Sequence, residues 1–234
     1  MPQNNQFQFA ISLEGAMPKV RVNCFTLSLD GYGAGPDQGP EAPVGVGAEG
    51  LHQWMFDTPS FRRRVLGEGG GRTGINEDFV ARSFENAGAW ILGRNMFGPV
   101  RGPWPDDSWK GWWGTTPPFH CDVFVLTRHP RASFEMEGGT VFHFVTDAIH
   151  AALDRARAAA GSRDVRVGGG ISTLRQYLEA GLIDEMHLAV APVVIGKGEN
   201  LLQELDLPAC GLGSVTVTAG EHGIAHYTLR RTAA

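Results

Sequence analysis

The stretch Val165–Leu174, which reads VRVGGGISTL, organises the rest of this sequence. Its first three residues favour an extended backbone, and three consecutive glycines follow at Gly168–Gly170. Beyond the glycines, apolar residues recur at helical spacing, as at Leu174 and Leu178. We therefore expect a strand, a tight glycine turn and a helix in direct succession, with Ser172 as the cap of the helix.

A glycine turn at the start of a helix is suited to bind a phosphate. Glycine has no Cβ, so the backbone can adopt a positive φ and another group can approach it closely. Free backbone N–H groups and the positive end of the helix dipole then attract an anion. The alternative is a strand-to-helix turn that binds nothing. The spacing differs from the dinucleotide fingerprint Gly-x-Gly-x-x-Gly.

The composition is that of an ordinary globular protein, since 42% of the 234 residues are hydrophobic and 19% are charged. We expect a single domain over residues 19–234, preceded by a flexible arm at residues 1–18 that is rich in Gln and Asn. The net charge of −5 and the lack of a long basic tract indicate no nucleic-acid partner. No apolar run approaches the ~18 residues of a membrane helix, so no membrane association is expected.

Several chemistries are disfavoured by the motifs that the sequence lacks. Cys24, Cys121 and Cys210 are widely spaced, without a CxxC pattern, so we expect no metal site and a reducing, cytoplasmic location. His143 and His150 fall on different predicted elements, which argues against a metal pair. There is no Gly-x-Ser-x-Gly nucleophile elbow and no Gly-x-x-x-x-Gly-Lys-Ser/Thr phosphate loop.

Strands and helices are predicted to alternate along most of the chain. The expected strands cover residues 20–29, 89–92, 122–127, 141–144, 165–167 and 186–195, and an antiparallel hairpin is expected at residues 214–218 and 225–230. The expected helices cover residues 51–55, 61–66, 77–86, 147–160 and 173–180, with a short helical turn at residues 201–205. Asn76 and either Thr146 or Asp147 are the predicted caps. This order predicts an α/β fold with a mostly parallel sheet and an antiparallel edge.

Ligands of such sheets bind at the carboxyl ends of the strands. Four predicted strand ends carry polar residues or glycines, namely residues 28–31, 93–95, 127–128 and 168–170. Arg94 and Arg128 each follow a strand directly. Because arginine offers a planar fork of donors, two such residues and a glycine turn suit the phosphates of a dinucleotide. The alternative for either arginine alone is a surface position.

The segment at residues 98–119 is rich in tryptophan, glycine and proline. Its tryptophans are Trp104, Trp109, Trp112 and Trp113. An irregular segment of this length is uncommon without a purpose. We expect it to cover core or a subunit interface, or to close the substrate side of a site, and a direct stacking role on substrate is the alternative.

Taken in order, the motifs resemble those of dihydrofolate reductase-like proteins, and most of all the C-terminal reductase domain of the bifunctional riboflavin-biosynthesis deaminase-reductase. The resemblance spans roughly residues 19 to 231. It rests on five motifs that occur in the same order: Ser28–Gly31, Ile91–Phe97, Val125–Arg128, Val167–Gly170 and Ala191–Gly198.

The resemblance implies a three-layer α/β fold with a mixed, mostly parallel sheet, and NADPH as the cofactor. It implies that the first loop, including Leu29 and Asp30, lies over the nicotinamide. It places five residues at the adenosine 2′-phosphate: Gly93, Arg94, Asn95, Thr127 and Arg128. It places the pyrophosphate on Gly168, Gly169, Gly170, Ile171, Ser172 and Thr173.

Two positions depart from the pattern of dihydrofolate reductases. Met96 stands where those enzymes carry a threonine that contacts the pyrophosphate. No acid falls into register at the start of the first helix, which Glu49 and Asp57 flank. The catalytic proton donor therefore stays open among Asp57, Tyr32, His52, Glu49 and water.

The leading hypothesis is an NADPH-dependent oxidoreductase that delivers a hydride to a carbonyl, an imine or a related double bond of a small molecule. A second hypothesis is a protein of the same fold that binds a nucleotide or a deazaflavin without turnover. A third is a purely structural oligomer. A homodimer is compatible with each of them.

Overall fold

The computed structural model describes residues 18–98 and 101–232. Except for Pro18, the predicted arm at residues 1–18 lies outside the described residues. Within the described residues, no helix is long and apolar enough to cross a membrane.

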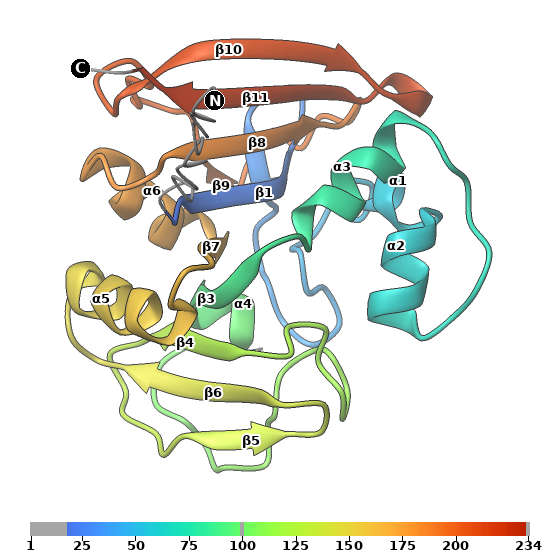
Figure 1. Cartoon of the computed structure of the whole chain (residues 1–234). Coiled ribbons are helices and arrows are strands. Elements are labelled where there is room, and N and C mark those ends of the chain that lie inside the picture. The colour runs from blue at the N-terminus through green and yellow to red at the C-terminus, as the bar shows by residue number, and fades with distance from the viewer. Residues whose placement is uncertain (1–17, 99–100, 233–234) are drawn as a thin grey trace, which may run out of the picture.

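A nine-stranded sheet forms the centre of the molecule (Figure 1). Its strands are β1 (Val20–Leu27), β3 (Ala87–Gly93), β4 (Asp122–Leu126), β5 (Phe134–Met136), β6 (Thr140–Val145), β7 (Asp164–Gly169), β8 (Glu185–Val190), β10 (Leu212–Ala219) and β11 (Ala225–Arg231). They lie in the order β10-β11-β8-β1-β7-β3-β4-β6-β5. The strands from β8 to β6 run parallel, while β10, β11 and β5 are antiparallel. The predicted mixed sheet with its C-terminal hairpin is confirmed.

Three short strands, which belong to two separate pairings, were not predicted. The first pairing is that of β5, which has three residues, with β6 at one edge of the sheet. The other is a separate small sheet of β2 (Tyr32–Ala34) and β9 (Glu199–Asn200), which ties the first loop to the segment after β8. Both lie in stretches too short to show a hydrophobic period.

Helices cover both faces of the large sheet. They are α1 (Gln53–Phe56), α2 (Pro59–Phe61), α3 (Ile75–Ser83), α4 (Arg94–Phe97), α5 (Ile149–Ala160) and α6 (Ile171–Glu179), with a π-helix at Arg62–Leu66 and a 3-10 turn at Glu221–Gly223. Figure 1 shows α5 and α6 on one side and α1 to α3 on the other. These are the layers of the predicted three-layer fold.

The alternation of side chains in the central strands divides the core between the two faces. In β3, Ala89 and Ile91 pack with the residues of α5 and α6. Trp90 and Leu92, which alternate with them, pack instead with Phe97 and tryptophans of the segment after α4. Because both faces are covered, nearly every residue of β3 is buried, as expected for a parallel strand in the centre of a sheet.

The helices start differently from the predicted caps. Gly170 is the residue before α6, and Ser172 lies inside the first turn without capping it. Ala148 precedes α5, so neither Thr146 nor Asp147 caps that helix.

The predicted cap of α3 is replaced by a residue distant in sequence. Asn76 lies inside the first turn of α3, and the Glu221 carboxylate accepts the N–H groups of Ile75 at 2.8 Å and Asn76 at 2.9 Å. A carboxylate that satisfies two free N–H groups at the positive end of a helix removes the need for a local cap.

Two predicted boundaries also differ. The strand expected at residues 186–195 ends at Val190, where β11 begins to pair at Ala225 and just before Pro192, which has no N–H to donate. The helical turn expected at residues 201–205 is a hydrogen-bonded turn from Leu205 N to Leu202 O, at 3.1 Å, and forms no helix.

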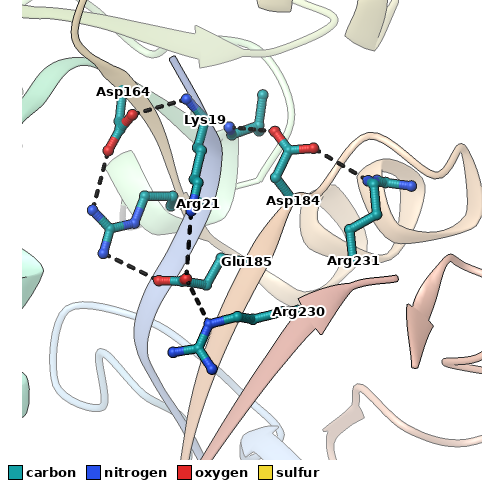
Figure 2. Close-up of polar contacts among 8 residues, drawn as sticks. Lys19, Arg21, Asp164, Asp184, Glu185, Arg230 and Arg231 are labelled. Atoms are coloured by element: carbon teal, nitrogen blue, oxygen red, sulfur yellow. Dashed lines mark hydrogen bonds and ion pairs between the residues drawn. The ribbon is translucent and has the colours of Figure 1, made fainter. Parts of the chain in front are cut away.

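The amino ends of three adjacent strands are held together by ion pairs (Figure 2). Arg21 on β1 lies 3.1 Å from Asp164 on β7 and 3.2 Å from Glu185 on β8. Glu185 also meets Arg230 on β11 at 3.2 Å. Asp184 accepts the Val20 N–H at 2.8 Å. These contacts fix the order β7-β1-β8-β11 at the edge opposite the glycine turn.

Candidate active site

A cavity of about 570 Å³ lies toward the carboxyl ends of β1, β3 and β7. The glycine turn of residues 168–170 lines it. Apolar residues from α1 to α3 and the π-helix line it as well, including Met55, Phe61, Val65, Val80 and Phe84. The tryptophan-rich segment contributes Trp112, Trp113 and Phe119. This is the edge of a parallel sheet at which ligands bind.

The glycine turn leaves open space and free N–H groups at the start of α6. Gly169 has a φ of +122°, which residues with a side chain rarely adopt. A Cβ added at Gly170 would meet no atom within 4 Å, so the space beyond it is open. Because no side chain caps α6, the free N–H groups at its start are available to a ligand.

The structure brings two of the predicted cofactor segments into contact. A Cβ on Gly93 would lie within 3.1 Å of the Gly170 nitrogen and closer still to the Thr173 hydroxyl, so only glycine fits between β3 and α6. Asn95, two residues after Gly93, lines the same cavity as Gly168, Gly169, Gly170 and Ile171.

Arg94, predicted at the 2′-phosphate, is covered by a tryptophan. Its guanidinium carbon lies 3.4 Å from the centre of the Trp104 ring, and its three side-chain nitrogens have no hydrogen-bond partner among the described residues. Burial, followed by the charge of Arg131, lowers the pKa of Arg94 to about 10. The neighbouring predicted residues differ, because Arg128 is exposed and the Thr127 hydroxyl accepts the His129 N–H at 3.1 Å.

The first loop is held by its own hydrogen bonds. Leu29 is 65% exposed. The Asp30 carboxylate accepts from the Ser28 hydroxyl at 2.6 Å, from Ile195 N at 3.1 Å and from Gly196 N at 2.7 Å. The bond from Ser28 is the main cause that lowers the pKa of Asp30. Neither Leu29 nor Asp30 lines the cavity, and Asp30 joins the first loop to the segment after β8.

Of the four side chains considered as proton donors, only His52 lines the cavity. Its burial lowers its pKa to about 4, so its imidazole is neutral at pH 7. Asp57 is exposed and pairs with Arg72 at 3.0 Å. Tyr32 belongs to the small sheet, and Glu49 is exposed and accepts the Gly47 N–H. The structure therefore does not gather these residues at one point.

The tryptophan-rich segment performs two of the roles weighed for it. Trp104, Trp109 and Trp113 pack on the core around Phe97, and the Trp109 indole donates to the Phe97 carbonyl at 2.8 Å. Trp112 and Trp113 also line the cavity. The segment thus covers core and closes one side of the cavity at once.

Arg166 is a cavity residue that the motif analysis did not single out. It stands in β7 with 9% of its surface exposed, and its guanidinium carbon lies 3.9 Å from the centre of the Trp90 ring. Burial lowers its pKa to about 10. The signal in the sequence was the VRV triplet itself, because a charged residue inside an otherwise apolar central strand is unusual.

A second missed feature is a buried chain of imidazoles beside the cavity. Cys24 lies at a bulge in β1 with a φ of +52°, and its N–H donates to His187 Nδ1 at 3.1 Å. The His187 proton is therefore on Nε2, which donates to His226 Nδ1 at 3.0 Å. His226 Nε2 in turn donates to the Asn76 side-chain oxygen at 2.9 Å. Burial lowers the pKa of His187 to about 3 and that of His226 to about 4, so both are neutral at pH 7.

The mostly parallel sheet, with a glycine turn and an apolar cavity at its carboxyl edge, defines a dihydrofolate reductase-like α/β protein. The family model of the RibD C-terminal domain matches residues 18–225. The chain therefore belongs to the RibD C-terminal domain family, which is a family of the reductase type.

Solved structures share this fold at low sequence identity. A proposed riboflavin biosynthesis protein from Shewanella sp. PV-4 is 19% identical, with a TM-score of 0.51 over 92% of this chain and 99% of that one. A pyrimidine reductase-like protein from Corynebacterium diphtheriae is 14% identical, with a TM-score of 0.50 over 96% of both chains. A diaminohydroxyphosphoribosylaminopyrimidine deaminase/5-amino-6-(5-phosphoribosylamino)uracil reductase from Thermotoga maritima is 12% identical, with a TM-score of 0.50 over 92% of this chain and 57% of that one. Among proteins of curated function, none matched the sequence.

Proposed function

We propose that the protein is an NADPH-dependent reductase of a small molecule that binds in the cavity. One observation carries the proposal: the open glycine turn before α6 and the apolar residues of α1 to α3 line the same cavity. A cofactor phosphate held at the turn would place the rest of the dinucleotide along this cavity. The family, which is of the reductase type, supports the same conclusion.

The residues of the turn fit a pyrophosphate. Gly170 leaves open space, and the uncapped start of α6 offers N–H groups, with Ser172 and Thr173 in its first turn. NADPH, when bound, supplies the hydride and its two electrons. The chain's own part is to hold the phosphates, to orient the substrate and to keep water away from it.

For the 2′-phosphate we keep the two arginines that the sequence predicted, but we give them unequal roles. Arg94 lies under Trp104, so an anion reaches its guanidinium only if that indole moves. Arg128 is exposed next to Thr127 at the end of β4. We therefore propose Arg128 as the main contact of the 2′-phosphate and Arg94 as a contact gated by Trp104.

The proton of the reduction is proposed to come from water or from a neutral side chain of the cavity. Among the described lining residues, Glu199 is the one carboxylate, and it pairs with Arg101 at 2.7 Å. His52 is neutral at pH 7, since burial lowers its pKa to about 4. A substrate that accepts hydride without a strong acid beside it fits this environment best.

Thermal unfolding with NADPH, with NADH and without nucleotide tests the cofactor. A ligand that binds only the folded state at ~100 times its Kd adds about 2.7 kcal/mol of stability. Turnover is then followed as loss of NADPH absorbance with carbonyl, imine and heteroaromatic compounds. Stabilisation without turnover would favour the nucleotide- or deazaflavin-binding alternative, and no stabilisation by any nucleotide would contradict the proposal.

A further inference from the structure

Arg166 is a buried cation on the cavity wall that lacks an acidic partner. Its Nη1 donates to the Ser83 carbonyl at 2.7 Å, and its Nη2 donates to the Asn23 carbonyl at 2.8 Å. Both acceptors are neutral, and no carboxylate among the described residues is within ion-pair distance of the guanidinium. Since a guanidinium has five N–H donors, these two bonds leave donors unused.

The other titratable groups of the cavity do not supply the missing negative charge. Glu199 pairs with Arg101. His52 and the Cys24 thiol are neutral at pH 7, because burial lowers the pKa of the imidazole and raises that of the thiol. The described lining therefore carries one positive charge that nothing neutralises. Burying such a charge is costly unless a ligand of opposite charge joins it.

The surroundings of Arg166 are flat and apolar. Its guanidinium lies over the Trp90 ring and 5.9 Å from the centre of the Phe84 ring. Phe25, Phe61 and Trp112 line the same cavity. Aromatic walls favour a ring system that can stack against them, and an arginine among them favours an anionic group on that ring.

We propose that Arg166 determines the specificity of the cavity, and that the substrate is a flat, mainly apolar molecule with one negative charge, such as an aromatic carboxylate. This proposal depends on the proposed function in one respect, namely that the bound molecule is called a substrate. The binding preference itself follows from the geometry and charge of the cavity.

The Arg166 guanidinium is held from the side of the cavity that α3 and β1 form, where we expect the substrate to lie. Its hydrogen-bond acceptors come from α3 and β1, and the rings beside it are Trp90 and Phe84. The glycine turn begins two residues after Arg166, and a Cβ on Gly168 would also meet the Trp90 ring, whereas a Cβ on Gly169 would meet Phe25 and Met96. We therefore assign the anion of Arg166 to the α3 side of the cavity, and the NADPH affinity of the variants described below tests whether a cofactor phosphate uses Arg166 instead.

Isothermal titration with matched pairs of probes tests the preference in the intact chain without nucleotide. The pairs are benzoate with benzamide, and 2-naphthoate with 2-naphthamide. The two members of each pair have a similar shape, but only the acid carries a negative charge. We expect at least one acid to bind about tenfold more tightly than its amide, a difference of about 1.4 kcal/mol. If no acid binds more tightly than its amide, or if no probe binds at all, the proposal is wrong.

Two variants assign the preference to the side chain. Arg166→Gln keeps a donor for one of the two carbonyls and removes the charge, so the acid preference should fall below about threefold. Arg166→Lys keeps the charge and should retain part of the preference. Arg21→Met is the control, because Arg21 is the register partner of Arg166 on β1 but has acidic partners. Near-UV circular dichroism and Tm show which variants are folded.

The outcomes separate this proposal from the proposed function. A folded Arg166→Gln protein that keeps the full acid preference overturns the assignment. So does a variant that loses NADPH affinity tenfold while the acid preference remains, because Arg166 would then serve the cofactor. If neither Arg166 variant folds, the wild-type ratio decides alone. NADPH binding without any acid preference would leave the reductase proposal standing and remove this one.

Discussion

Arg21 on β1 and Arg166 on β7 are register partners on adjacent parallel strands, and their charges are treated in opposite ways. Arg21 meets Asp164 and Glu185, so its charge is neutralised within the sheet (Figure 2). Arg166 meets two carbonyl oxygens and a tryptophan ring. The difference teaches that, at the same level of two adjacent strands, Arg21 contributes to the stability of the sheet through its acidic partners, whereas Arg166 faces the cavity with a charge that we propose a ligand neutralises.

The imidazoles of His187 and His226 show a third way to bury a basic group. An imidazole can lose its proton near neutral pH, whereas a guanidinium cannot. These two rings therefore stay neutral, donate in one direction along the chain to Asn76, and stack on Phe79 at 4.2 Å. Among the described residues that line the cavity, Arg166 alone keeps a charge without an acidic partner, because Glu199 pairs with Arg101.

The largest effect on stability is expected when the pH is lowered, because the folded protein holds both His187 and His226 in their neutral form. In the unfolded chain, both imidazoles bind a proton below about pH 6.5. In the folded protein, burial lowers the pKa of His226 to about 4 and that of His187 to about 3, so protonation needs a lower pH. The free energy of unfolding therefore falls as pH drops, by about 2 kcal/mol for each imidazole between pH 7 and pH 5. Urea unfolding at both pH values measures the change.

A His226→Gln variant is the control for this pH dependence. It removes one titrating ring, so its loss of stability between pH 7 and pH 5 should be smaller than that of the wild type by about 2 kcal/mol. An unchanged loss would show that carboxylates, and not this pair, cause the acid sensitivity.

The next effect concerns the neutralised arginine. Arg21→Met leaves Asp164 and Glu185 without their shared cation, both at side chains that are at most 15% exposed. Breaking a buried pair costs about 3–5 kcal/mol, and we expect about 3 kcal/mol because Glu185 keeps Arg230. Lys19→Met is the matched control, since the exposed Lys19 lies 3.9 Å from Glu185. Its loss should lower the free energy of unfolding by less than about 1 kcal/mol. Equal losses in urea unfolding would contradict the comparison.

A similar contrast separates the two arginines proposed for the 2′-phosphate. Arg128 is exposed, whereas Arg94 lies under Trp104. Arg128→Ala should weaken NADPH by about 1.5–3 kcal/mol, the cost of a lost charged hydrogen bond, and leave NADH nearly unchanged. Arg94→Ala should have a smaller effect, and the double variant the largest. Equal losses for NADPH and NADH, measured by titration, would remove both arginines from the 2′-phosphate.

Much of the sheet could be predicted from the sequence because its strands are continuous apolar runs with clear stops. The strand at Val123–Val125, the hairpin at the C-terminus and the glycine turn are local signals of this kind. The caps could not be predicted, since Glu221 reaches α3 from 145 residues or more along the chain. A contact of that range leaves no local pattern.

The candidate site could be located from the sequence where backbone conformation decides its shape, but not where distant side chains meet. A glycine in a sequence indicates a backbone position that a side chain would not fit. Gly93 and Gly169 were therefore predicted from the sequence to belong to the candidate site, and they are close together in the structure. That Trp104 lies on Arg94, and that Asp57 pairs with Arg72 away from the cavity, depends on how distant segments pack. Arg166 was overlooked because its partners, the carbonyls of Asn23 and Ser83, have no sequence signature.

The smallest expected effect tests the turn on which the cofactor site depends. Gly169→Val adds a branched side chain at a φ of +122°, and its Cβ would lie 3.2 Å from the Phe25 ring and 3.3 Å from the Met96 sulfur. The variant should have a lower Tm. Its affinity for the cofactor should fall at least tenfold, which corresponds to about 1.4 kcal/mol. Loss of affinity in this variant alone could therefore follow from strain.

Gly170→Ala separates strain from occlusion. Gly170 has a φ of −75°, and a Cβ there meets no atom within 4 Å, so the variant should keep the wild-type Tm. Its methyl group would nevertheless occupy the open space in front of the N–H groups of α6, where the pyrophosphate is proposed to lie. We expect a weaker Kd for NADPH in calorimetric titration of a protein as stable as the parent. A Gly170→Ala protein with unchanged stability and unchanged NADPH affinity would mean that the open space holds no phosphate, and the three glycines would then serve only to connect β7 with α6.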